Sequence, residues 1–218
     1  MRTLTLLAAA LFASIGVFGQ SGSQGRNSAA AAAGNDLSHD RHDGLTISAD
    51  PYTDVERAKK TFGKANPIPA GILPVEVFLR NETDQPIRID LTTIQLEVHP
   101  PDSKRQDIDS LSAVEVAKAI VHPEGSATPT TRRFPPIGIP SSSNDKKVAN
   151  MADTLRPLAL DADIVPPMGM IQGFLFFDLS HEMSLADNAS LYVPDVKLVP
   201  SNKPLIFFEV ALGAKQER

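Results

Sequence analysis

The chain has 218 residues, with 21 basic and 26 acidic side chains and a formal net charge of −5. This length is enough for one domain with a sizeable core, and a mildly acidic chain gives no electrostatic reason to bind nucleic acid or an anionic membrane. The chain contains no Cys, which excludes disulfides, thiolate nucleophiles and Cys-ligated metals.

Residues 1–19 have the pattern of a secretory signal peptide. Arg2 precedes a largely apolar run from Leu4 to Val17, which is too short to cross a bilayer. We expect cleavage after Gly19 and export to the periplasm or the medium, with no membrane span in the mature chain. An uncleaved membrane anchor is the alternative.

Residues 20–44 are rich in Gly, Ser, Ala and Asn, and we expect a flexible linker because they cannot bury enough apolar surface to fold. The stretch His39-Asp40-Arg41-His42-Asp43 contains side chains that can bind divalent metals. Because Arg41 lies among them, a solvated polar tail is the better interpretation and no metal site is predicted.

Alternating apolar residues predict strands from Leu45 onwards. Leu45–Ser48 is a short first strand, and residues 53–62 fit either a helical turn or an edge strand. Residues 75–80 and 87–91 alternate on either side of a turn and predict a β-hairpin. The apolar phase then slips at residues 92–93, which indicates a break where the chain changes sheets.

The most apolar stretch is Gly173-Phe174-Leu175-Phe176-Phe177-Asp178-Leu179. Side chains of a strand alternate between its two faces, and here both faces are apolar. We therefore expect a central strand that is covered on both sides.

Residues 99–164 do not have the pattern of sandwich strands. Ser112 and Glu115 form a capping-box pattern before a helix at 113–121, and a second helix fits 145–155, ending before Pro157. We expect these two helices to cover the second apolar face of the strand at 173–179.

Two strands are expected near the end of the chain. Residues 189–199 are interrupted by Pro194, which favours an edge position, and residues 205–212 follow. Five Phe residues lie in the strands around residues 174 and 207, and we expect one aromatic cluster.

These elements predict a mainly β fold: an antiparallel, immunoglobulin-like β-sandwich over residues 45–213, with an inserted segment at about 99–164 that contains two short helices. The motifs Gly71-Ile72-Leu73-Pro74-Val75, Pro166-Pro167 before the Phe-rich strand, and Phe207-Phe208-Glu209-Val210 resemble exported bacterial immunoglobulin-like proteins of unknown function. The resemblance covers most of residues 50–212 and implies fold and export, but no catalytic residue.

Known catalytic, phosphate-binding and dinucleotide-binding motifs do not occur in the sequence. His122, Glu124 and Ser126 are close together, but a polar loop explains them better than a hydrolytic group. His99 and His181 are interpreted as surface residues, and Asp178 as an acceptor of turn hydrogen bonds. We therefore predict no catalytic, cofactor-binding or metal-binding residues. The glycosylation patterns at Asn81 and Asn188 are interpreted as accidental.

The sequence favours a non-enzymatic envelope or extracellular module that binds a protein partner. Arg132, Arg133 and Phe134 are the predicted contact residues, because Arg and aromatic side chains are enriched at interfaces; a solvated loop is the alternative. A second hypothesis is a carrier of a small ligand or metal, with a pocket between the sandwich and the inserted helices.

Overall fold

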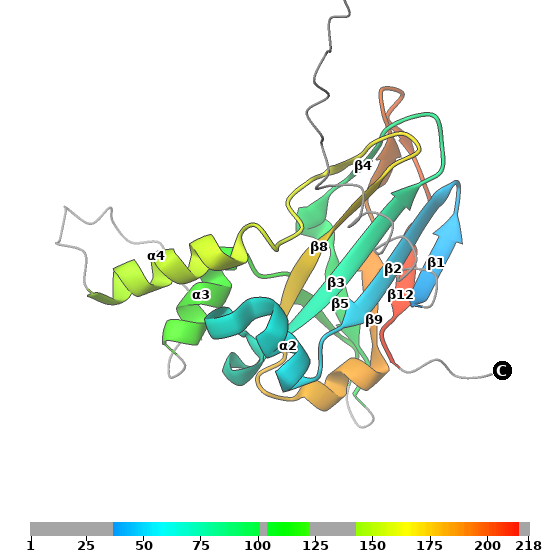
Figure 1. Cartoon of the computed structure of the whole chain (residues 1–218). Coiled ribbons are helices and arrows are strands. Elements are labelled where there is room, and N and C mark those ends of the chain that lie inside the picture. Colours follow the sequence, from blue (N-terminus) through cyan, green and yellow to red (C-terminus); the bar gives the residue numbers. More distant parts are fainter. Residues whose placement is uncertain (1–36, 101–103, 123–142, 214–218) are drawn as a thin grey trace, which may run out of the picture.

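The computed structural model describes residues 37–100, 104–122 and 143–213. This part of the chain is mainly β, with three antiparallel four-stranded sheets and a few helices (Figure 1). The expected signal peptide, residues 1–19, lies outside the described residues.

The first sheet, sheet A, has the strand order β1-β2-β3-β8. Its strands are β1 (Ser38–His42), β2 (Leu45–Pro51), β3 (Ile72–Asn81) and β8 (Met170–Asp178). The long β3 strand pairs with β2 on one side and with β8 on the other, so it forms the centre of this sheet.

Two further sheets complete the β structure. Sheet B has the order β11-β10-β4-β7, formed by Lys203–Pro204, Val196–Leu198, Ile87–Ile89 and Ile164–Val165. Sheet C has the order β12-β9-β5-β6, formed by Phe208–Ala211, Ala189–Val193, Gln95–Val98 and Gln106–Asp109.

The main core lies between sheet A and the other two sheets. Every second side chain of β3 and β8 points into it, as the two-residue period of a strand requires. Its buried members include Leu73, Val75, Leu175 and Phe177 from sheet A, and Ile89, Leu96, Leu191, Val193, Phe208 and Val210 from sheets B and C. The protein therefore contains two packed β layers.

Three α-helices cover the other face of sheet A, near the end where β8 finishes. They are α2 (Val55–Phe62), α3 (Ala113–Val121) and α4 (Ser143–Leu155). Phe174 and Phe176 point to this side and are buried in a second core with side chains from all three helices. The predicted covering of the second apolar face is confirmed. Four short 3-10 helices occur at Gly63–Ala65, Ile68–Ala70, Leu91–Thr93 and Met183–Asn188.

The Phe-rich strand β8 is buried on both faces, but it is the edge strand of sheet A rather than its centre. Its open edge is covered by neighbouring backbone: Leu111 N–H donates to Phe176 C=O (2.7 Å), and Leu160 N–H donates to Phe174 C=O (3.0 Å). A Cβ at Gly173 would lie 2.6 Å from the backbone of Leu160, so glycine permits this close approach.

The predicted hairpin is wrong, because β3 and β4 belong to different sheets. Asn81 holds the connection between them: its Nδ2 donates to the carbonyls of Gln85, Val165 and Pro166, and its Oδ1 accepts from Thr83. Alternation of apolar residues identifies a strand but not its partner. The expected break at residues 92–93 is confirmed, since the 3-10 turn Leu91–Thr93 separates β4 in sheet B from β5 in sheet C.

The end of the chain also differs from expectation. Pro194 separates β9 from β10, and both strands lie inside their sheets rather than at an edge. The expected single aromatic cluster is wrong, because neighbouring side chains of a strand point to opposite faces. Phe174 and Phe176 pack with Phe62 beneath the helices, whereas Phe208 lies in the main core.

The expected insertion also contributes two strands. The segment 99–164 contains β6, which pairs with β5, and the start of β7, which pairs with β4. Strand β6 then leads to Ser110, which forms an isolated bridge with Phe177 of β8. This connection closes one side of the sandwich.

The other side is closed by β1, which lies within the expected linker 20–44. It pairs with β2 and contacts β12. Asp40 accepts a hydrogen bond from the backbone N–H of Glu209 (3.0 Å), and the ring of His42 stacks on Phe208. The polar composition of the segment predicted a solvated tail, but backbone pairing and these side-chain contacts make it part of the domain, which begins before Leu45.

Candidate functional site

Helix α3 begins at a complete capping box. The Ser112 hydroxyl accepts from the Glu115 N–H (3.3 Å), and the Glu115 carboxylate accepts from the Ser112 N–H (2.8 Å). These bonds satisfy backbone groups that a helix start leaves unpaired. Val116 and Ala117 are buried in the second core with Phe174 and Phe176, so they determine which face of the helix points toward sheet A.

Helix α4 packs beside α3 and is anchored by Ala152 and Leu155, its two buried residues. Both helices are confirmed: the predicted range 113–121 is the observed one, and the second helix starts at Ser143 instead of Asp145. The capping box and the Pro at position 157 are local signals, which explains why the boundaries were predictable.

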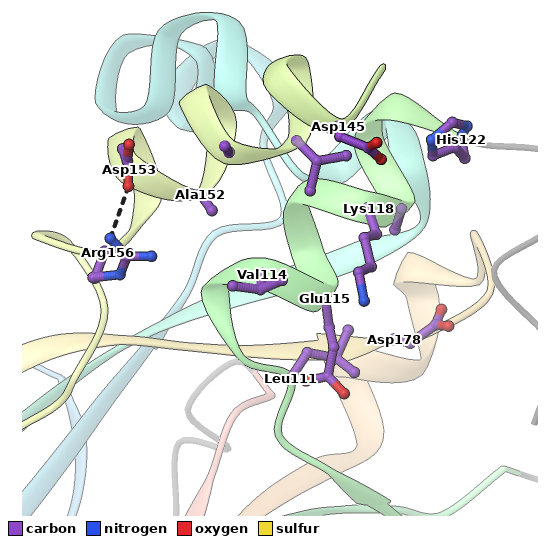
Figure 2. Close-up of a pocket in the computed structure, with 13 residues that line it drawn as sticks. Leu111, Val114, Glu115, Lys118, His122, Asp145, Ala152, Asp153, Arg156 and Asp178 are labelled. Carbon is purple, nitrogen blue, oxygen red and sulfur yellow. Dashed lines mark hydrogen bonds and ion pairs between the residues drawn. The ribbon is translucent and has the colours of Figure 1, made fainter. Parts of the chain in front are cut away.

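A groove with a cavity volume of about 810 Å³ lies along these two helices and reaches the end of β8 (Figure 2). Val114 is 40 % exposed at this groove, an unusual position for a large apolar side chain. The other apolar residues that line the groove are Leu111, Ala119, Val148, Ala149 and Ala152. The groove therefore offers apolar surface that is open to a ligand.

Charged side chains surround this apolar surface. Hydrogen bonds from Ser112 lower the pKa of Glu115, with a smaller contribution from the charge of Lys118. Asp153 and Arg156 form an ion pair at 2.7 Å on the opposite side of the groove (Figure 2). Asp145 and Asp178 also line the groove, giving four carboxylates against two cations.

A second polar cluster lies where α2 meets sheet A. The Tyr52 hydroxyl donates to the Glu76 carboxylate (2.8 Å), and the Arg57 guanidinium lies 3.7 Å from the centre of the Tyr52 ring. Burial raises the pKa of both Tyr52 and Glu76. Arg57 also pairs with Asp50. Because these bonds join the helix to the sheet, we interpret the cluster as structural.

The structure places some of the residues that the sequence analysis singled out. Asp178 accepts a hydrogen bond from the Ser180 N–H (2.8 Å), which confirms its predicted role at a turn. His99 and His181 are exposed, as expected of surface residues, and His122 is exposed at the groove. Arg132, Arg133, Phe134, Glu124 and Ser126 lie outside the described residues.

No three His, Cys, Asp or Glu side chains within ranges 37–100, 104–122 and 143–213 are grouped so that they could hold a metal ion. In the same part of the chain, no helix combines the length and apolar character that crossing a membrane requires.

No protein-family model matches the chain, and comparisons with curated proteins and with solved structures found no match either. The resemblance to exported immunoglobulin-like proteins therefore stays a prediction.

The sequence analysis named a pocket between the sandwich and the inserted helices as an alternative, and it named none of the residues that line the α3–α4 groove. Val114 and Ala149 were missed because they lie outside the buried stripes of their helices. A usable signal was present in α3, where Val114 adds an apolar side chain beyond the buried Val116 and Ala117. An amphipathic surface helix normally has polar residues at such positions.

Proposed function

We propose that this protein is a non-enzymatic interaction module that binds an apolar segment of a partner polypeptide in the α3–α4 groove. The observation that carries the proposal is the apolar surface of the groove, with Val114 at 40 % exposure inside a rim of charged side chains. Interfaces commonly combine an apolar centre with a polar rim. Grooves between helices also accept amphipathic helices.

We further propose that the sandwich belongs to the immunoglobulin-like class and that the chain is exported. Two packed β layers with alternating inward side chains support the first proposal. The short apolar run after Arg2 supports export to the periplasm or the medium, with a protein partner in the cell envelope.

A groove-specific crosslinking experiment tests the function. A photo-crosslinking amino acid is placed at Ala149, which is exposed and lines the groove, in cells that produce the full chain. We expect a discrete crosslinked polypeptide that disappears when Val114→Glu puts a charge on the apolar surface.

Val55→Glu is the matched control, because Val55 is a similarly exposed helical valine (46 %) on α2 that does not line the groove. It should leave the crosslink intact. Equal loss in both variants would contradict the proposed site, and so would the absence of a crosslink when the photo-crosslinking residue at position 149 is the only change.

A carrier of a small amphipathic ligand is the second candidate. The cavity volume of about 810 Å³ lies within the range of small-molecule pockets. Native mass spectrometry of protein purified from its own cells distinguishes the two: a bound small molecule that Val114→Glu abolishes favours the carrier, and a bound polypeptide favours the module.

A further inference from the structure

The outer surface of sheet C is uncovered by any α-helix in the described part of the chain, since α2, α3 and α4 all pack on sheet A (Figure 1). We call this surface the open face. Two rows of side chains cross it. One row is Glu209, Tyr192, Gln95 and Asp109, and the other is Ala211, Ser190, Glu97 and Asp107.

The open face carries four carboxylates and one cation. Arg105 binds Glu97 and Asp107, each at 2.8 Å, and Gln95 donates to Asp109 (2.9 Å). The Glu209 side chain makes no hydrogen bond or ion pair with any other described residue, although its backbone N–H donates to Asp40. Four negative charges minus one positive charge leave the face at −3.

Glu97 shows that these charges act on one another. Its side chain is only 5 % exposed although it lies on an outer face, and it forms an ion pair with Arg105. Burial raises the pKa of Glu97, and the negative charges of Glu209 and Asp107 raise it further, against the lowering by Arg105. An additional cation near Glu209 would relieve this repulsion.

Exposed apolar and aromatic side chains come just before Glu209 in the chain, and Tyr192 is paired with Glu209 in the sheet. Phe207 is 48 % exposed and its ring centre is 5.5 Å from that of Tyr192, while Ile206 is 63 % exposed. Aromatic faces attract guanidinium and ammonium groups, and carboxylates form their strongest hydrogen bonds with the same groups. The aromatic side chains and the carboxylates of the open face therefore both favour a bound cation.

We propose that the open face binds a basic, Arg- or Lys-rich segment of a partner polypeptide, with cations over Tyr192 and Phe207 and paired with Glu209 and Asp109. The proposal goes beyond the function of the α3–α4 groove, because the open face lies on the opposite side of the main core.

Fluorescence anisotropy with the full chain tests the proposal. The probe is a labelled peptide of alternating Arg and Gly, and the reference is a peptide of alternating Gln and Gly. We expect the protein to bind only the Arg peptide, with an affinity that falls as salt is raised. The double variant Glu209→Gln, Asp109→Asn should weaken binding about tenfold, since it removes two exposed charge pairs.

The matched control is Asp163→Asn, Asp195→Asn, which removes the same net charge near sheet B. It should change the affinity for the Arg peptide less than about twofold, because these two charges lie outside the open face and salt screens them. Equal weakening by both double variants would overturn the proposal, because it would mean attraction by net charge. Preferential binding of a neutral oligosaccharide would also overturn it.

Chemical-shift mapping on the unmodified protein gives an independent test. The Arg peptide should shift the backbone signals of Gln95, Tyr192 and Glu209. Shifts confined to α3 and α4 would assign the basic segment to the groove and overturn the proposal for the open face. If the groove proposal fails, the shifts expected on sheet C remain the same.

Discussion

The imidazole ring of His42 stacks on the phenyl ring of Phe208, with ring centroids 3.7 Å apart and planes inclined by 12°. His42 belongs to β1 and Phe208 to β12, so this contact joins the edge of sheet A to the edge of sheet C. The Nε2 atom of His42 also forms a hydrogen bond with the carbonyl oxygen of Phe207 (3.1 Å).

Replacing His42 by Ala should therefore destabilise the fold by about 1 kcal/mol, a typical value for a stacked aromatic pair. The free energy of unfolding from urea titration measures the effect. His39→Ala is the control, because His39 is exposed on the same strand, and it should have little effect. Equal losses in both variants would mean that the stacking contributes nothing.

Phe176→Ala should cost ~3–5 kcal/mol, because the substitution loses transfer free energy and leaves a cavity. Phe176 is 1 % exposed and packs against Phe62 and Phe174 beneath the helices. Phe207→Ala, at a site that is 48 % exposed, should cost much less. Chemical denaturation measures both, and a loss below ~1 kcal/mol for Phe176→Ala would contradict the described core.

Glu76→Gln should make the fold more stable than the unmodified protein, and this gain in stability should increase as the pH rises. Burial raises the pKa of Glu76 above its ordinary value of 4.5. Such a carboxyl contributes stability that is full below the unfolded-state pKa and is lost as the pH rises through the folded-state pKa. Glu76→Gln removes this loss, so the stability difference should grow as the pH rises above 4.5.

Glu115→Gln should show the opposite dependence. Hydrogen bonds from Ser112 lower the pKa of Glu115 below 4.5, so its contribution is present above that value and is lost as the pH falls through the lowered pKa. This variant should be less stable than the unmodified protein at neutral pH, with a difference that shrinks in acid. Denaturation curves across this range check both variants, and parallel profiles would contradict both predictions.

Asn81→Ala should cost about 2 kcal/mol, because several buried or partly buried backbone groups lose their partners. Asn81 is 1 % exposed, and its amide binds three carbonyls and the Thr83 N–H. Asn188→Ala, at an exposed position, serves as the control. Thermal unfolding that shifts equally in both variants would argue against the structural role of Asn81.

The sequence predicted elements better than it predicted their partners. The Ser112–Glu115 capping box located α3, and the two apolar faces around Phe176 correctly required a cover on each side. Strand pairing depends on which backbone edges meet in space, and apolar alternation contains no such information. This is why β3 and β4 were expected to pair and do not.

The candidate surfaces were less predictable for a related reason. The groove depends on how α3 and α4 pack together, and the open face depends on four strands from distant parts of the chain. Strand β1 was missed because its side chains are polar, while its stability comes from backbone pairing and from contacts with residues more than a hundred positions away.

The hydrogen bond from Glu209 to Asp40 spans 169 residues of sequence, and this separation has a consequence for biosynthesis. Strand β1 is synthesised well before β12, the strand that it closes against. Contacts of such long range form late, because a large loop must close first. A nascent chain that stops before residue 208 would keep an unsealed sheet edge, so folding can be completed only after nearly the entire domain has been made.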